Sequence, residues 1–365
     1  MSDITNTTDV RPSGDASAAA SVSPSAGPSA GPSADVSGRD DEDSPAPHRR
    51  KRRPWRIALI ATASLFALAI AVAAGGYAYV NHLASSIPRI KVAGLVAATS
   101  SGQTILVTAS PFGPTGSVDQ DTSFASEYSR LFMLLHVNAN GKAGGAVTIP
   151  GDTVLNVPGH GAQPLWKADE EGGPSLVVTT ITGATGVPIN DYARIDFTHV
   201  ANLLEAVGGI TVTLPETSTA FGQTFPQGPN RLTGVSAVYY ARDPALSDEG
   251  RTLRQEVIVR ATLAKIANYH LLINPVTMIS VLNALTSALT VDSNLTNSQV
   301  MSLATELGGL KGSAATFVTA PTQTVHGKLV LNTAIASQLW TAVEQDDLAG
   351  FVKEYPTTLT PQVVP

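Results

Sequence analysis

The stretch Leu131-Phe-Met-Leu-Leu-His-Val137 decides the fold class, because every residue in it except His136 is apolar. A near-continuous apolar run of this length is typical of a strand that is covered on both faces. The turn Asn138-Ala-Asn-Gly141 follows it, and Gly145–Pro150 is predicted to return as the second strand of a hairpin. His136 itself is expected to be a buried histidine whose hydrogen bonds are satisfied within the core.

Outward from this hairpin, short apolar runs alternate with segments of helical periodicity. Further strands are predicted at 104–109, 191–197, 210–214 and 315–320. Helices are predicted at 174–185, 198–207, 234–241, 250–269, 275–289, 297–307 and 332–344, followed by a polar tail. This interleaving predicts an α/β fold: one layered α/β/α domain around a central mixed sheet.

The N-terminal part of the chain has a different composition. Residues 1–54 consist mainly of Ser, Ala, Pro, Gly and Asp and end in the basic run Arg49–Arg53, which predicts a disordered cytoplasmic tail. Residues 55–80 are apolar enough to cross ~30 Å of hydrocarbon as a transmembrane helix. A buried core helix and a cleaved signal peptide are the alternatives. The basic run places the N-terminus inside, so a stalk at 81–100 and the domain at 101–350 are expected outside the cell membrane.

Charge and cysteine content narrow the function classes. The chain has 365 residues, a formal charge of −6 and no cysteine. The absence of cysteine excludes a disulfide scaffold, a thiolate metal site and a cysteine nucleophile. The mild acidity argues against a nucleic-acid binder. The negative charge lies in residues 81–365, with 15 basic and 21 acidic residues.

Against that acidic background, three arginines gather within thirteen positions: Arg242, Arg251 and Arg254. Arginine is always charged and offers a fork of donors that matches phosphate oxygens. Arg251, Arg254 and Gln255 share one face of the predicted helix, and Arg251 lies near its N-terminus. The pattern predicts a phosphate site. The alternative is a solvated helix face, with the arginines paired to nearby carboxylates such as Asp243, Asp248, Glu249 and Glu256.

Asp152, directly after the strand that ends at Pro150, is a candidate metal ligand or general base, or alternatively a residue that caps a turn. The group Lys167, Asp169, Glu170 and Glu171 is expected to form a solvated loop before a helix. The sequence contains no Ser-His-Asp pattern, P-loop, HExxH motif or dinucleotide-binding glycine fingerprint.

The order of these motifs resembles the LytR-CpsA-Psr family of cell-wall phosphotransferases. The resemblance extends from about Thr104 to Asp347. The segments that carry it are Ser129–Asn138, Ile149-Pro-Gly-Asp-Thr153, Gly172-Gly-Pro174, Asp191–Phe197, Glu205-Ala-Val-Gly-Gly-Ile210, Leu232–Arg242 and Asp248-Glu-Gly-Arg-Thr-Leu-Arg-Gln255.

The resemblance implies that a polyprenyl-pyrophosphate-linked glycopolymer binds with its lipid in an apolar cavity, its diphosphate on arginines and Mg²⁺ on aspartates. This sequence departs from that pattern where the family has charged site residues. Those positions hold Pro111, Arg130, Gly151, Pro164 and Pro244. The family's site residues that remain are Asp152, Arg242, Arg251, Arg254 and Gln255. Arg130 stands where the family has a metal-binding aspartate, so the resemblance implies that its charge replaces the metal cation beside the diphosphate.

From these residues we expect Arg251 and Asp152 to be catalytic, and Arg242, Arg251, Arg254, Gln255 and Arg130 to bind pyrophosphate. The metal ligands are not assigned. The expected function is binding of polyprenyl-(pyro)phosphate-linked glycopolymer and its transfer to peptidoglycan at the cell membrane. The alternative is a non-catalytic accessory protein that binds the lipid phosphate or the glycopolymer.

Overall fold

The computed structural model describes residues 54–98, 102–110, 131–141, 144–268, 275–309, 315–360 and 363–364. The first 53 residues of the predicted tail lie outside them, as does Arg130. The chain divides into two units, Met1–Ile60 and Ala61–Pro365, and all elements after the first helix belong to the second unit.

The first helix, α1, runs from Pro54 to Ser86 and contains the whole stretch, 55–80, that was predicted to cross a membrane. Within the described residues, Phe66–Ser86 is long and apolar enough for a membrane span, with a mean hydropathy of 1.3 and 6% of its length buried. Large apolar side chains such as Phe66 and Tyr77 are 70% and 64% exposed. A helix with so little buried surface does not resemble the core helix of a soluble domain.

A seven-stranded mixed sheet forms the centre of the domain, as predicted. In spatial order its strands are β1 (Arg89–Ile90), β12 (Leu289–Asp292), β7 (Asp191–Asp196), β2 (Gln103–Ser110), β3 (Leu131–Val137), β4 (Gly144–Ile149) and β13 (Ala315–Thr319). β2 pairs with β7 in parallel, and β4 pairs with β13 in parallel. β3 runs antiparallel to both β2 and β4, so the predicted hairpin is confirmed.

This pattern brings the carboxyl ends of β7, β2, β4 and β13 to one edge of the sheet, called the carboxyl edge below. In sheets of this kind, ligands bind in the crevice outside the carboxyl ends of the strands. Asp152 follows β4 at this edge.

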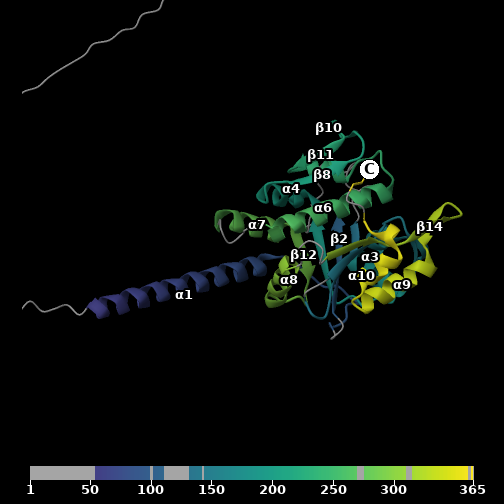
Figure 1. The fold of residues 1–365 in the computed structure, drawn as a ribbon. Helices are drawn as coiled ribbons and strands as arrows, with labels where there is room; N and C mark the ends of the chain where they lie inside the picture. Colours follow the sequence, from purple (N-terminus) through teal and green to yellow (C-terminus); the bar gives the residue numbers. More distant parts are fainter. Residues whose placement is uncertain are drawn as a thin grey trace, which may run out of the picture. The chain divides into compact units, whose positions relative to one another are not determined.

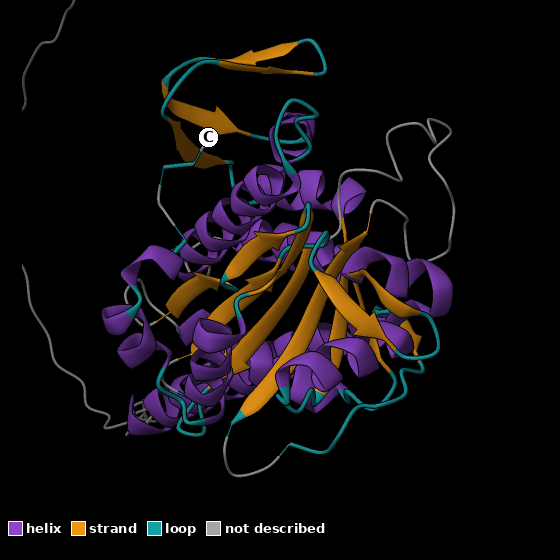
Figure 2. Ribbon diagram, turned by 90° about the vertical axis from the view of Figure 1, so that its right-hand side faces the viewer, coloured by secondary structure: helices purple, strands orange, loops and turns teal. Residues whose placement is uncertain are grey.

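Side chains from both faces of the sheet are buried, in two separate cores. Along β3, Leu131 and Met133 belong to one core, whereas Phe132 and Leu134 belong to the other. This alternation follows from the period of two in a strand and explains the near-continuous apolar run. Figures 1 and 2 show helices on both faces of the sheet.

The helices divide between the two faces. The first core includes residues of α4 (Phe197–Ala206), α5 (Val235–Ala241), α6 (Asp248–Asn268), α7 (Pro275–Ala288) and α8 (Asn297–Gly309). The second core includes residues of α3 (Leu165–Thr185), α9 (Thr333–Glu344) and α10 (Leu348–Glu354). Each of these helices except α10 overlaps a helix predicted from the sequence.

Several short strands form two-stranded sheets outside the central one. These pairs are β5 (Val154–Val157) with β6 (Gly161–Pro164), β8 (Ile210–Leu214) with β11 (Gly228–Leu232), β9 (Ser218–Ala220) with β10 (Gln223–Phe225), and β14 (Thr322–Val325) with β15 (Lys328–Leu331). Of these strands only β8, which alternates apolar residues with Thr, was predicted. The other runs of three to five residues carry too little periodicity to identify.

Helix α3 corrects the expectation of a solvated loop at Lys167 and Asp169–Glu171. The helix begins at Leu165, so these residues are helical, and it bends at Gly173 before continuing through Pro174. Gly173 has φ 63° and ψ −158°, a conformation that favours glycine, and proline tolerates the first turn of the segment that follows. Gly172-Gly-Pro174 therefore marks a kink between two helical segments.

The C-terminal segment corrects the expectation of a polar tail at 351–365. Helix α10 crosses that boundary, and Leu348 and Phe351 are each only 5% exposed. Further on, the Thr360 amide donates to the Phe317 carbonyl over 3.0 Å, and Val364 is fully buried. Leu348 and Phe351, three residues apart, form the buried face of α10. The helix was not predicted because a stretch of seven residues is too short to show helical periodicity.

His136 lies in the core with both ring nitrogens hydrogen-bonded, as predicted. Its Nδ1 lies 3.0 Å from Thr104 Oγ1 and its Nε2 lies 2.7 Å from Asp346 Oδ1. Asp346 comes from the turn between α9 and α10, and its Oδ2 also accepts from the Ala139 amide over 2.9 Å. This histidine therefore joins the hairpin to the C-terminal helices.

Candidate functional site

The loop after β4 is tied to the start of α3. The Trp166 amide donates to the Gly151 carbonyl over 3.1 Å, and the Leu165 amide donates to the Thr153 carbonyl over 2.9 Å. Asp152 is exposed between them, and its Oδ1 accepts a hydrogen bond from the Trp166 indole Nε1 over 3.0 Å. The structure thus places the predicted Asp152 at the carboxyl edge, with an indole as a partner that sequence reasoning missed.

Arg242 and Arg251 flank the turn that joins α5 to α6. Arg242 caps the end of α5, is half-buried, and has its pKa lowered by that burial. Arg251 lies in the first turn of α6, also half-buried, and its Nη1 donates to the Leu246 carbonyl over 2.5 Å. The turn therefore holds Arg251 through its backbone and leaves part of the side chain accessible.

Arg254 lies in a closed network one turn further along α6. Its Nη1 donates to Asp243 Oδ2 and to the Tyr240 carbonyl, each over 3.0 Å, and its Nη2 donates to Ser218 Oγ over 3.0 Å. The guanidinium also lies 4.4 Å from the centre of the Tyr240 ring. Arg254 is only 1% exposed.

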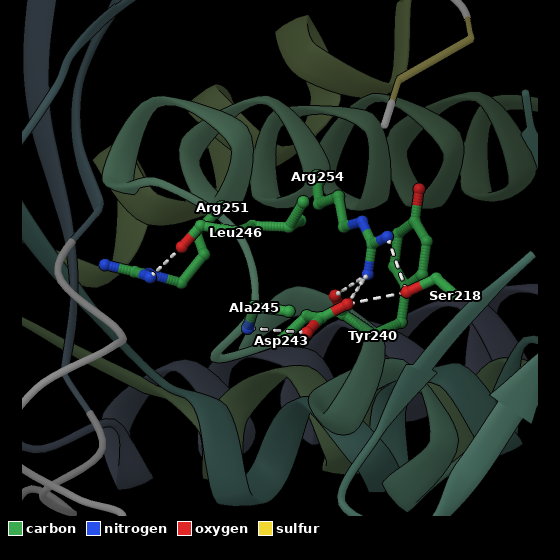
Figure 3. Close-up of polar contacts among 7 residues, drawn as sticks. All are labelled: Ser218, Tyr240, Asp243, Ala245, Leu246, Arg251 and Arg254. Atoms are coloured by element: carbon green, nitrogen blue, oxygen red, sulfur yellow. Dashed lines mark hydrogen bonds and ion pairs between the residues drawn. The ribbon is translucent and has the colours of Figure 1, made fainter. Parts of the chain in front are cut away.

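Figure 3 shows the guanidinium groups of Arg251 and Arg254 directed away from each other. The sequence grouped them because residues at i and i+3 share a helix face. The structure corrects that grouping for Arg254, whose donors serve the protein itself; Asp243, one of the carboxylates proposed as an alternative partner, forms the ion pair. Gln255 is 2% exposed beside it, and Arg130 lies outside the described residues.

A second buried polar group, also on α6, is Glu256. It accepts hydrogen bonds from Thr319 Oγ1 over 3.3 Å and from Thr360 Oγ1, and burial raises its pKa to about 7. Arg260 Nη1 donates to the Thr360 carbonyl over 3.1 Å. Because Thr319 ends β13, these bonds place Glu256 at the carboxyl edge and attach the C-terminal segment there.

The contact between Glu256 and β13 also indicates how far Arg251 lies along α6 from the carboxyl edge. The two residues are five positions apart, which is about 7.5 Å of rise along a helix. The first turn of α6 therefore begins roughly 7.5 Å along the helix from a point that contacts the carboxyl edge. Glu256 was expected among the carboxylate partners of the arginines, but the structure pairs it with threonines.

Sequence reasoning also missed a polar chain on the α3 face of the sheet. Arg194 Nε donates to Tyr192 Oη over 3.1 Å, and Tyr192 Oη lies 2.6 Å from Thr108 Oγ1. Arg194 Nη2 lies 3.5 Å from Asp169 Oδ1 in α3. Tyr192 and Arg194 are two positions apart on β7, so strand alternation was the signal that could have paired them.

An apolar cavity of about 120 Å³ lies between the sheet and the helices of the first core. Strands β2, β3, β7 and β12 contribute residues to it, as do α4 and α7. Helix α6 contributes Ile258, Val259 and Thr262. Ile258 is seven residues beyond Arg251, so a rise of about 10 Å separates the half-buried arginine from the start of the cavity wall.

The residues present do not fit a magnesium site in the described part of the chain. Among the described residues, no group of three or more His, Cys, Asp or Glu side chains could hold a metal ion. Asp152, in the loop after β4, accepts from the Trp166 indole, and Asp169 of α3 pairs with the Arg194 guanidinium. An arginine beside a carboxylate already supplies the charge that a cation would bring.

Comparison with known proteins was made against family models, curated sequences and solved structures. The model of the LytR_cpsA_psr family matches residues 95–349. "Polyisoprenyl-teichoic acid--peptidoglycan teichoic acid transferase TagU" of Oceanobacillus iheyensis is 31% identical over 150 residues, covering 39% of this chain and 47% of TagU. "Probable cell wall biosynthesis protein LcpB" of Corynebacterium glutamicum is 33% identical over 147 residues, covering 39% of this chain and 35% of LcpB.

The fold is shared with solved structures. The "LytR-Csp2A-Psr enzyme from Actinomyces oris" superposes with a TM-score of 0.56 at 19% identity, covering 71% of this chain and 96% of that one. At that identity the likeness concerns the fold, and it agrees with the mixed α/β architecture described above. The sequence matches to TagU and LcpB span half or less of those proteins.

Proposed function

Because the chain belongs to the LytR-CpsA-Psr family, we propose that it binds a polyprenyl-(pyro)phosphate-linked glycopolymer and transfers the glycopolymer to peptidoglycan. The name of TagU specifies a polyisoprenyl-linked donor and a peptidoglycan acceptor. That pair of substrates supports the same substrate classes for this chain.

One observation carries the proposal: α6 combines a phosphate-binding side chain with the wall of an apolar cavity. Arg251 is half-buried in the first turn of α6, where its guanidinium favours a phosphate. Ile258, Val259 and Thr262 line the cavity two turns away. A lipid phosphate has this same order of parts, a charged head followed by an apolar chain.

The transfer itself requires positioning and charge stabilisation. An acceptor hydroxyl oxygen forms a bond to the phosphorus next to the glycopolymer, and the bond from that phosphorus to the bridging oxygen breaks. Lipid phosphate leaves with the electron pair, and the hydroxyl proton passes to Asp152. Arg251 and Arg242 stabilise the phosphoryl oxygens, and Arg130 joins this set on the grounds of sequence.

The proposal places the chain in the cell membrane. Phe66–Ser86 serves as the membrane anchor, and Arg49–Arg53 keeps the N-terminus in the cytoplasm. The domain then lies outside, where lipid-linked donor and peptidoglycan meet. Labelling of cysteines introduced on either side of the helix in intact cells tests this orientation.

The test of function is a transfer assay with the full chain in detergent, a labelled lipid-linked glycopolymer and purified peptidoglycan. We expect Arg251→Ala to lower the transfer rate by about 100-fold or more, because a preorganised donor to developing charge is lost. Arg231→Ala removes an exposed arginine that bonds to the Gly208 carbonyl and serves as the matched control. Equal rates for wild type and Arg251→Ala would refute the role of Arg251.

A second candidate function is binding without transfer, and the missing metal grouping in the described residues favours it. A binding protein holds polyprenyl phosphate equally well with EDTA present and shows no turnover. A transferase that uses Mg²⁺ loses turnover in EDTA and regains it when Mg²⁺ is restored. Turnover that persists in EDTA indicates transfer through arginine charge alone.

A further inference from the structure

Trp166 is held at the carboxyl edge by two separate hydrogen bonds to the loop after β4. Its amide bonds to the Gly151 carbonyl over 3.1 Å, and its indole Nε1 bonds to Asp152 Oδ1 over 3.0 Å. The ring is half-buried, since it packs against the second core but keeps part of its surface accessible. Both the position and the orientation of the ring are therefore defined by contacts at the edge.

Polar side chains surround this indole. Asp152 is exposed on one side, and Lys167 Nζ lies 5.0 Å from the centre of the ring. One helical turn further along α3, Asp169 faces Arg194 of β7 over 3.5 Å. The Lys167 ammonium thus lies over the face of the indole, and the Asp152 carboxylate lies at its N–H edge.

We propose that Trp166, with Asp152 and Lys167, forms a subsite for a pyranose ring of the glycan. A pyranose has an apolar face of C–H groups and a rim of hydroxyl groups, so it is recognised by an aromatic surface with polar groups at its border. Asp152 accepts from a hydroxyl group, and Lys167 moves aside on its flexible stem to donate to another.

The subsite rests on the proposed function and specifies it further. A sugar stacked on Trp166 brings its hydroxyl groups to the carboxylate that receives the proton in the transfer step. The ring in the subsite is therefore the acceptor sugar of peptidoglycan. A sugar of the donor glycopolymer has the same chemistry, and the experiment below distinguishes the two.

Trp340 shows how a tryptophan with a packing role is placed in this domain. It is 5% exposed and belongs to the second core on α9. Trp166 also packs against the second core, but it keeps accessible surface and directs its indole N–H to an exposed carboxylate. Packing of the Trp166 ring alone would not require the hydrogen bond from its indole N–H to Asp152, because an exposed carboxylate is already hydrated by water.

The test uses the full chain in detergent with ¹⁵N-labelled tryptophan, which gives three indole signals, one for each tryptophan. The spectrum of Trp166→Phe identifies the Trp166 signal. Soluble disaccharide fragments of peptidoglycan are titrated in one arm and lipid-free glycopolymer in the other. We expect the Trp166 signal to move saturably with peptidoglycan fragments while the Trp340 signal stays in place.

Affinity for the fragments is then compared between variants. Trp166→Ala is expected to weaken binding about 10-fold, whereas Trp166→Phe, which keeps an aromatic face, is expected to weaken it about threefold. Asp152→Asn is expected to weaken it by a similar factor of about three, because the charged acceptor is lost. Trp166→Phe also keeps much of the packing, so the comparison stands if Trp166→Ala folds poorly.

The outcomes separate this inference from the proposed function. A Trp166 signal that responds to glycopolymer alone assigns the subsite to the donor and overturns the acceptor assignment. A signal that responds to neither glycan, while polyprenyl phosphate still binds and Arg251→Ala abolishes that binding, overturns the subsite and leaves the function intact. Loss of both responses counts against the proposed function.

Discussion

Two arginines on the first two turns of α6 have the same chemistry and different surroundings. Arg254 is 1% exposed and bonds to Asp243, Tyr240 and Ser218, so its charge is neutralised within the protein. Arg251, three residues earlier, is half-buried and donates to the Leu246 carbonyl. Burial, rather than residue type or helix face, determines which arginine stabilises the fold and which is accessible to a phosphate.

The same division holds for carboxylates. Glu256 is buried and accepts from threonines of two other segments, whereas Asp152 is exposed at the carboxyl edge beside Trp166. Buried polar networks of the first kind are expensive to interrupt, because a group left without a partner has no water to replace it. Substitution of an exposed group such as Asp152 should change the stability little, but it changes what the carboxyl edge can bind.

The largest expected effect comes from breaking the ion pair of Arg254. Arg254→Met leaves Asp243, whose side chain is 2% exposed, without its counter-charge, and should lower the free energy of unfolding by about 3–5 kcal/mol. Urea unfolding of the full chain in detergent measures this change. Arg254→Met combined with Asp243→Asn should recover part of the loss. If the double variant is less stable than the single one, the network is not what stabilises this turn.

The next effect is a dependence of stability on pH that arises from Glu256. Burial raises its pKa to about 7 in the folded chain, whereas an unfolded glutamate has a value near 4.5. The folded state binds the proton more tightly, so the stabilisation is complete below about pH 4.5 and is lost as the pH rises through 7. The shift corresponds to a loss on the order of 3 kcal/mol between those limits.

Glu256→Gln provides the matched control, since it keeps the shape and removes the titration. We expect this variant to be the more stable protein at pH 8 and to lose the dependence between pH 4.5 and 7. Urea midpoints across this range measure both effects. A wild-type midpoint that stays flat, or one that rises with pH, would show that Glu256 is not protonated in the fold.

The smallest expected effect on stability is that of Arg251→Ala. Because this side chain is partly exposed, its loss should change the free energy of unfolding by no more than about 1 kcal/mol. The same variant should lose most of its affinity for polyprenyl phosphate. A stability loss as large as that of Arg254→Met would remove the distinction between the two arginines.

Much of the fold could be predicted because its signals are local. The strand at Leu131–Val137 was predicted with the bounds that the structure shows, and β2, β4 and β13 of the same sheet lie within a residue or so of their predicted ranges. The near-continuous apolar runs and the flanking turn residues contain that information. Helix α10 and the short paired strands were missed, because their stability comes from contacts with distant segments.

The candidate site could be predicted only in part. Asp152 follows the strand that ends at Ile149, and Arg251 lies in the first turn of its helix, as the element ends predicted. Trp166 and Arg194 were not recognised, because their partners lie 14 and 25 residues away in the chain. Magnesium binding stays a prediction from the resemblance, and the described residues offer no grouping for it.

The sequence by itself therefore determined the α/β class, the order of elements, the family and the apolar N-terminal stretch. These properties depend on composition, periodicity and motif order, all of which are local along the chain. Only the tertiary structure decided which arginine is neutralised and which is accessible, where Glu256 finds its threonines, and how Trp166 meets Asp152. Those outcomes depend on burial and on partners brought together across the sheet, and charge and spacing along a helix do not encode them.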